Sequence, residues 1–172
     1  MVVAIVAILA SIAAPSFVEM LRRNRLAAAV SSMQASLNLA RSEAVKRGSD
    51  ARVTIAANST AGVWINGWTV FADRTADANG GVAPSADVAG GAGVTRLEVV
   101  APPSGPVSVG QTGINYFTYN GQGRMIDAAG GGVVNRSIWF FDGSSEKYCL
   151  VINNTGRVRS ARVAGNVACP AS

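Results

Sequence analysis

The chain has 172 residues, with 15 Lys and Arg against 10 Asp and Glu and no histidine, and its length suits one hydrophobic core. Without histidine the commonest general base and zinc ligand are missing, so we expect no enzymatic activity and no cofactor or metal site. The formal charge of +5 favours anionic partners such as phospholipid head groups or nucleic acid.

The first segment, residues 1–14, reads MVVAIVAILASIAA and is apolar on every side. Such a helix belongs in lipid or in a protein interior, and an ordinary core helix is the alternative. It is shorter than the roughly 20 residues that cross a bilayer, so it is an interfacial or buried helix or the remainder of a longer one. It lacks the charged start and the cleavage site of a secretory signal peptide.

Residues 15–48 are amphipathic, and no turn residues separate them from the first segment, so we expect one helix of roughly 40 residues or more over residues 1–48. Pro15 is expected to kink this helix, and Gly48 is placed to cap its end. The cluster Arg22-Arg23-Asn24-Arg25 suits a helix leaving a bilayer, although a solvated face has the same pattern. The apolar stripe consists of Leu26, Val30, Met33, Leu37, Ala40 and Ala44.

Residues 49–172 are expected to form a β-rich globular head, because short β-branched and aromatic runs alternate with Gly, Asn, Asp and Pro clusters. One helix followed by many strands predicts an α+β fold, with the long N-terminal helix packed against an antiparallel β-sheet. Loops are expected at 77–93, 101–113 and 128–132. The expected strands are Ala51–Ala57, Trp64–Ala72, Val94–Val100, Asn115–Tyr119, Ser137–Asp142, Lys147–Asn153 and Arg157–Val163.

Most large aromatic side chains fall within the expected strands and are not interleaved with Lys or Arg. We therefore interpret them as core, with a stacking platform for bases as the alternative. They are Trp64, Trp68, Phe71, Phe117, Trp139 and Phe141. The acidic residues stand beside turns, where short carboxylates satisfy backbone donors, so no catalytic pair is expected. These are Asp73, Asp127, Asp142 and Glu146.

Two cysteines, Cys149 and Cys169, lie near the end of the chain without the spacing of a redox or metal motif. In an exported domain they would form a disulfide that closes a loop of about 20 residues, which the chain-entropy model values at roughly 3 kcal/mol. Two buried free thiols in a reducing compartment are the alternative.

Five segments together carry a family resemblance. They are MVVAIVAILASIAAPSF at the start, LNLARSEAVKRG over Leu37–Gly48, GWTVFAD over Gly67–Asp73, FTYNGQGR over Phe117–Arg124, and CLVINNTGRVRS with the cysteine that follows. They resemble the type IV minor pilins and pseudopilins of the FimT/GspH family. The apolar helix with proline before Ser-Phe is shared across type IV pilin-like proteins, and ARSEAVKRG and GRVR are similar to the FimT/GspH branch.

The resemblance implies a methylated protein made from a precursor that a dedicated prepilin peptidase cleaves. It also implies a helix held in the bacterial inner membrane and later packed with other pilins in a fibre, and a head that is first periplasmic and then on the pilus or pseudopilus surface. The Gly-Phe processing site and the glutamate that follows it in the family are absent, so we expect Met1 to lie inside the family's helix.

The resemblance to FimT-type pilins with a GRxR motif implies that the head binds double-stranded DNA for uptake in natural transformation. In a strand after an Asn-Thr-Gly turn, alternate arginines point to one face and the valine between them to the other, which gives a cationic surface for phosphates. The expected DNA-binding residues are Gly156, Arg157, Arg159, Arg162 and Lys147, and Val158 is the intervening valine.

Two alternatives to a DNA-binding head stay open. The arginines could be a solvated strand edge that charge protects from pairing with other strands. The protein would then be a purely structural minor pilin that initiates or caps a pilus. It could also be a GspH-like pseudopilin of type II protein secretion, which shares the fold.

Overall fold

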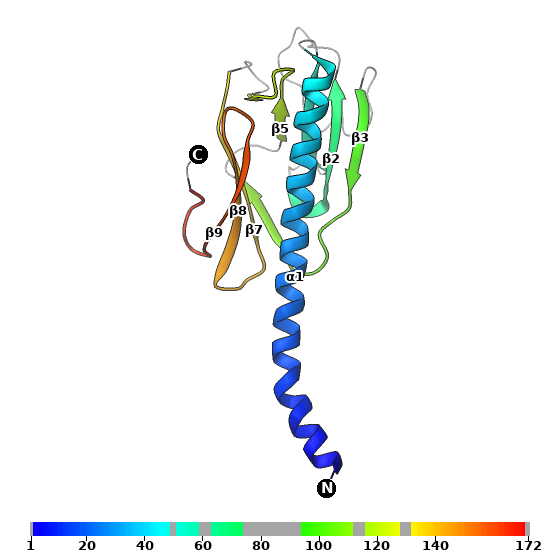
Figure 1. Cartoon of the computed structure of the whole chain (residues 1–172), viewed down its shortest axis with the longest axis vertical. Helices are drawn as coiled ribbons and strands as arrows, with labels where there is room; N and C mark the ends of the chain where they lie inside the picture. The colour runs from blue at the N-terminus through cyan, green and yellow to red at the C-terminus, as the bar shows by residue number, and fades with distance from the viewer. Residues whose placement is uncertain are drawn as a thin grey trace.

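One long helix dominates the protein, and its C-terminal half is embedded in a β-rich head (Figure 1). The computed structural model describes residues 2–48, 51–58, 63–73, 94–111, 116–127 and 132–170, with side chains from residue 17 onward. The N-terminal half of the helix projects from the head, so the start of the chain lies far from the strands.

Helix α1 (Val2–Arg47) is continuous over 46 residues, as the uninterrupted sequence pattern predicts. It passes through Pro15 without a break, and Figure 1 shows its dark blue end inclined to the rest of the helix. That Pro15 causes this inclination stays a prediction. In the described part of the chain, no helix combines the length and the apolar character that crossing a membrane requires.

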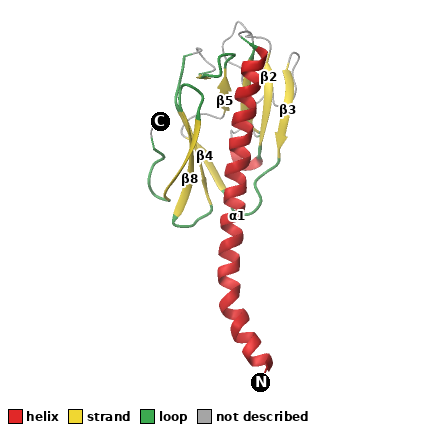
Figure 2. Cartoon of the chain, in the orientation of Figure 1, coloured by secondary structure: helices red, strands yellow, loops and turns green. Residues whose placement is uncertain are grey.

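The strands form two antiparallel sheets, drawn in yellow in Figure 2. The first sheet has the order β3-β2-β1-β5-β6 and the second has the order β4-β7-β8-β9. The strands are β1 Arg52–Ala57, β2 Trp68–Asp73, β3 Val94–Val100, β4 Ser108–Gln111, β5 Tyr116–Tyr119, β6 Met125–Ile126, β7 Arg136–Phe141, β8 Glu146–Ile152 and β9 Val158–Ala164. The fold is therefore α+β, as expected, with its antiparallel strands divided between two sheets.

The predicted apolar stripe of α1 is the face that the head buries. All six of its side chains, from Leu26 to Ala44, are at most 5% exposed. The helix contacts β1, β2 and β5 of the first sheet and β7, β8 and β9 of the second. The stripe ends in the small side chains of Ala40 and Ala44, which let the strands approach the helix closely. One helix face thus forms a common core with both sheets.

A buried polar contact fixes the helix against the first sheet. The Trp68 indole Nε1 donates to Ser36 Oγ at 3.0 Å, and Ser36 Oγ donates to a carboxylate oxygen of Glu98 at 2.6 Å. Ser36 is fully buried, so both of its bonds replace contacts with water. These two bonds tie helix α1 to β2 and to β3.

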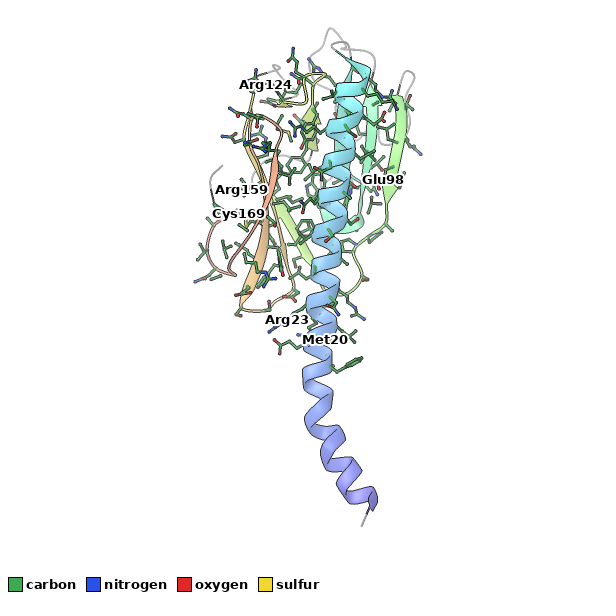
Figure 3. All side chains as sticks on the ribbon, viewed as in Figure 1. Met20, Arg23, Glu98, Arg124, Arg159 and Cys169 are labelled. Atoms are coloured by element: carbon green, nitrogen blue, oxygen red, sulfur yellow. A yellow bond between two sulfur atoms is a disulfide. The ribbon has the colours of Figure 1, made fainter. Side chains whose placement is uncertain are left out.

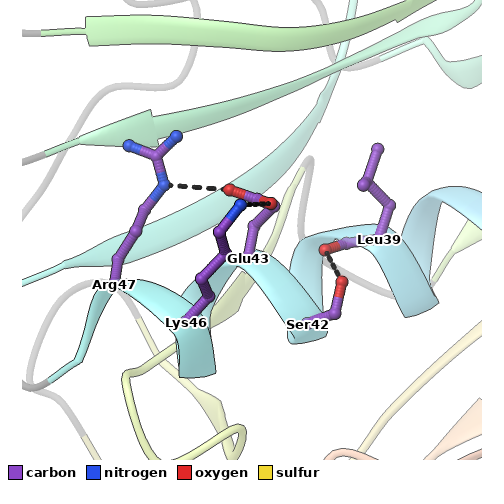
Figure 4. A network of polar contacts seen from close by, with 5 residues as sticks. All are labelled: Leu39, Ser42, Glu43, Lys46 and Arg47. Carbon is purple, nitrogen blue, oxygen red and sulfur yellow. Dashed lines mark hydrogen bonds and ion pairs between the residues drawn. The ribbon is translucent and has the colours of Figure 1, made fainter.

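Two charge pairs, drawn in Figure 4, and a glycine cap fix the end of α1. The Glu43 carboxylate lies 3.2 Å from Arg47 Nε and 3.4 Å from Lys46 Nζ. The hydrogen bond from Arg47 is the main reason that the pKa of Glu43 is lowered. Gly48 has a φ of 83° and donates its N–H to the Ala44 carbonyl at 3.2 Å, which confirms the left-handed cap.

Three predictions about the strands and loops are corrected by the structure. Trp64–Asn66 form a short 3-10 helix (η1) and Gly67 has a φ of 85°, so the strand expected from Trp64 begins at Trp68. The loop expected at 101–113 contains β4, which pairs with β7, and the short β6 was also not expected. The loop expected at 77–93 and residues 128–131 lie outside the described residues.

The core prediction is correct for four aromatic side chains and wrong for two. The four are Trp64, Trp68, Phe71 and Phe117, each at most 2% exposed. Trp139 and Phe141 are only partly buried, whereas Phe140 between them is fully buried. The alternation of β7 directs Ile138 and Phe140 to the core and the other two to the opposite face. On that face Trp139 lies beneath the ammonium of Lys147, 5.7 Å from the ring centroid.

Deleting residues 1–14 is expected to leave a folded head. Among the described side chains of α1, burial begins at Leu26, whereas Phe17 and Met20 are 60% and 59% exposed. The whole buried stripe therefore survives the deletion. A thermal melt followed by circular dichroism should stay cooperative, with a midpoint close to that of the full chain. A broad, non-cooperative melt would show that the apolar segment belongs to the core.

Candidate nucleic-acid interface

The arginines of the GRxR motif follow a tight turn over Asn153–Arg157. The Asn153 N–H donates to the Arg157 carbonyl at 3.1 Å, and the Gly156 N–H donates to the Asn153 carbonyl at 2.8 Å. The Asn153 side-chain oxygen accepts from the Arg157 N–H at 2.9 Å and from the Thr155 hydroxyl at 2.7 Å. The asparagine therefore closes the turn from within, as Asn does in hairpin turns.

A second turn, over Asn120–Arg124, repeats this pattern of bonds. Its Asn120 N–H donates to the Arg124 carbonyl at 3.1 Å, and the Gly123 N–H donates to the Asn120 carbonyl at 2.8 Å. The Asn120 side-chain oxygen accepts from the Arg124 N–H at 3.0 Å. The sequence carries a signal for this likeness, because NGQGR and NNTGR share the pattern N-x-x-G-R.

Arg41 of helix α1 joins the two turns. Its Nε donates to the Gly123 carbonyl and its Nη2 donates to the Thr155 carbonyl, both at 3.1 Å. The turns also touch directly, since a Cβ added to Gly156 would lie 2.0 Å from the Gly123 carbonyl oxygen. Arg41 was not among the residues expected from the sequence, because an arginine on the polar side of a helix gives no sign of bonds to turns far along the chain.

Tyr119 lies beneath the joined turns. A Cβ on Gly156 would lie 2.9 Å from Tyr119 Cε1, and the tyrosine is fully buried. Burial raises the pKa of Tyr119 well above its ordinary value, and the charge of Arg41 opposes the rise only in part. Burial therefore favours the neutral form of this phenol over its phenolate. The turns rest on an uncharged aromatic support.

The structure places the two GRxR arginines on the surface and the valine between them against the core. Arg157 and Arg159 are exposed, whereas Val158 is partly buried and packs on the hydrophobic core. Strand β9 begins at Val158, one residue later than expected. The turn and the anchored valine together direct the side chains of Arg157 and Arg159 towards solvent.

Lys147 and Arg162 lie apart from this pair. Arg162 is the cross-strand partner of Tyr148, and its guanidinium carbon lies 4.9 Å from the centroid of that ring. Tyr148 packs against the core, so Arg162 belongs to the face of β9 opposite Arg159. Lys147 lies on the same face as Arg159. The cross-strand partner of Arg159 is Val151, and Lys147 is four residues away from Val151 along β8, a distance of about 13 Å at strand spacing.

Arg162 instead lines a groove of about 760 Å³ between α1 and the β7–β8 connection. Charges of both signs line this groove, including Arg22, Arg23, Asp142 and Glu146. Burial acts to raise the pKa of Asp142, but hydrogen bonds from Ser144 hold it below its ordinary value. A groove with such mixed charge does not favour a polyanion.

The expected disulfide between Cys149 and Cys169 is present, with a Cα–Cα distance of 5.7 Å. Cys149 is fully buried on β8, opposite Ala161 of β9. The bond therefore ties the end of the chain to the two strands that carry Lys147 and Arg159.

Within the described ranges, no three Cys, Asp or Glu side chains converge to hold a metal ion.

The architecture is that of a pilin-like protein, with one long N-terminal helix and an antiparallel β head. It is similar to the crystal structure of the type IV minor pilin FimU from Pseudomonas aeruginosa (strain PAO1), with a TM-score of 0.58 and 20% identity over 80% of this chain and 88% of that one. The family model described as "Type II transport protein GspH" matches residues 29–156. The chain belongs to this GspH family. A search of curated proteins gives no match.

The resemblance to the FimT/GspH family and the pilin-like fold are thus confirmed. The family match ends at Gly156, so Arg157 and Arg159 lie beyond it. The family match therefore covers the part of α1 that packs in the head from residue 29 on and the strands from β1 to β8, and it does not bear on the role of the two arginines.

Replacing Gly156 by alanine is expected to destabilise the head more than the same change at Gly143. Both glycines have a positive φ, 78° and 85°, so both variants carry the cost of a left-handed alanine, about 1–2 kcal/mol. Only Gly156 faces a backbone oxygen, whereas a Cβ on Gly143 meets nothing within 4 Å. Urea denaturation should show a further loss of about 1–3 kcal/mol in Gly156→Ala. Equal losses in the two variants would mean that the turns are not in contact.

Proposed function

We propose that this protein is a minor pilin of a type IV pilus whose head binds double-stranded DNA for uptake in natural transformation. The observation that carries the proposal is the pair Arg157 and Arg159, both exposed and both directed by a turn that is anchored to the helix. Guanidinium groups are suited to phosphate oxygens, which they can contact with two donors at once.

The expected mode of binding is contact with the DNA backbone without reading of bases. Two exposed arginines after a turn form a small cationic surface, which suits contacts with phosphate oxygens. Phosphate contacts fix position but carry no sequence information. The affinity should therefore be weak, independent of sequence and strongly reduced by salt.

The helix supports the membrane and fibre partners of this proposal. Below the head, α1 exposes Phe17, Val18, Met20 and Leu21 directly before the arginines at positions 22, 23 and 25. Figure 3 labels Met20 and Arg23 at the point where the helix leaves the head. An apolar segment followed by a basic cluster suits a helix that crosses from lipid into water. We propose that the protein is held in the inner membrane with a periplasmic head, that a prepilin peptidase processes its precursor, and that other pilins pack against this helix.

A second candidate is a pseudopilin of type II protein secretion, or a structural minor pilin without DNA binding. The description of the matching family as a type II transport protein favours it, as does the end of the family match before the two arginines. In this case Arg157 and Arg159 would be a solvated strand edge.

Changing Arg157 and Arg159 together to alanine is expected to weaken DNA binding without changing the fold. In a titration of the full chain in a nonionic detergent with a duplex of mixed sequence, the wild-type log affinity should fall with log salt at a slope of roughly −2 to −4. The double variant should lose about two units of that slope, equally for every sequence. Its melting temperature should stay close to that of the wild type because both side chains are exposed.

A matched control is the double variant Arg23→Ala and Arg96→Ala, which removes the same charge from the helix and from β3. It should bind as the wild type does. If both double variants weakened binding equally, net charge alone would explain the affinity, and if neither weakened it, Arg157 and Arg159 would not bind DNA. If the wild type did not bind the duplex even at low salt, the proposal would be wrong. The second candidate, a secretion pseudopilin or a structural minor pilin, would then replace it.

A further inference from the structure

The turn Asn120–Arg124 presents an arginine beside the GRxR motif. Arg124 follows Gly123 as Arg157 follows Gly156, and both arginines are exposed. Figure 3 labels Arg124 and Arg159 on the same side of the head, across the helix from Glu98. Each turn thus presents an exposed arginine directly after its glycine.

The contact between the turns limits how far apart these arginines can be. A Cβ on Gly156 would lie 2.0 Å from the Gly123 carbonyl oxygen, and this oxygen belongs to the peptide that leads into Arg124. With about 3.8 Å between consecutive Cα atoms, the Cα atoms of Arg124 and Arg157 lie within about 10 Å of each other. Two side chains as long as arginine can therefore reach the same phosphate or neighbouring phosphates.

The charge around the joined turns is positive. Neither five-residue turn contains an acidic residue, and the guanidinium of Arg41 lies between them with its donors on their carbonyls. The nearest acid along the chain, Asp127, lies 4.0 Å from Arg136. A surface of this kind favours a polyanion, such as the DNA backbone, over a cationic or an apolar partner.

We propose that Arg124 binds the DNA backbone together with Arg157, and that Arg41 positions both by holding the two turns together. This inference rests on the proposed function, which it extends from one turn to two. The role assigned to Arg41 is positioning, because its Nε and one Nη donate to carbonyls of the two turns. The binding surface is therefore a composite of two hairpins, and neither hairpin supplies it alone.

The test compares single variants of the full chain in a nonionic detergent, titrated with the same duplex over a range of salt concentrations. Arg124→Ala should weaken binding roughly three- to tenfold and flatten the salt slope by about one. Arg124→Lys should restore the slope, since the charge returns. The control Arg96→Ala, which removes an exposed charge from β3, should change neither quantity.

Arg41→Lys tests positioning, because a lysine keeps the charge but cannot hold both carbonyls in the same way. It should weaken binding while the slope stays as in the wild type, since Arg124 and Arg157 still neutralise phosphates. Melting curves establish that each variant is folded, and Arg124→Gln replaces the alanine variant if that one is not.

The outcomes separate the two proposals. If the double variant of Arg157 and Arg159 loses slope while Arg124→Ala matches Arg96→Ala, the composite surface is wrong and the DNA-binding head stands. If the wild type does not bind the duplex, both proposals fail. If the wild type bound vesicles rich in anionic lipid but not the duplex, and Arg124→Ala weakened the vesicle binding, the charge would belong to the membrane and both proposals would fail.

Discussion

The structure depends on one face of α1 acting as the core of two sheets at once. Six side chains from Leu26 to Ala44 are buried against strands of both sheets, so the sheets are held to each other largely through the helix. The small residues near the end of this stripe bring the helix backbone close to the strands. Burial on this scale fixes the rotation of the helix about its axis, since turning it would expose the stripe to water. Every polar residue on the flanks of α1 then has a fixed place relative to the head.

Arg41 shows what this fixed rotation allows. It lies next to Ala40 on the helix, and its guanidinium reaches one turn from each sheet, because β5 and β6 belong to the first sheet and β8 and β9 to the second. The glycine of the GRxR motif is explained by the same geometry. Gly156 has a positive φ and lies against Gly123, so no side chain fits there. Gly156 thus allows the two turns to pack together, and the exposed arginines that follow it provide the cationic surface.

Much of the fold could be predicted because its signals are local and periodic. The buried stripe, the helix length, the glycine cap and Val94–Val100 as a strand all follow from spacing within one element. The phase of β7 could not be predicted, because Trp139, Phe140 and Phe141 are all large and apolar and only the tertiary contacts decide which of them is buried. Arg41 and Arg124 were missed for a related reason: their importance lies in contacts between turns more than 30 residues apart, which no pattern within one element reveals. Arg162 was grouped with Arg157 and Arg159 by proximity in sequence, but strand alternation separates them.

The central claim is that two turns held by one helix residue form a single surface for DNA. Solution NMR of the isotopically labelled full chain in a nonionic detergent, titrated with a short duplex, tests it most directly, since amide shifts report where the ligand lies. The account predicts that the amides of Asn120–Arg124 and of Asn153–Arg159 shift together, with one common dissociation constant, while those of β3 stay unchanged. Shifts confined to one turn, or centred on the groove beside Arg162, would contradict it.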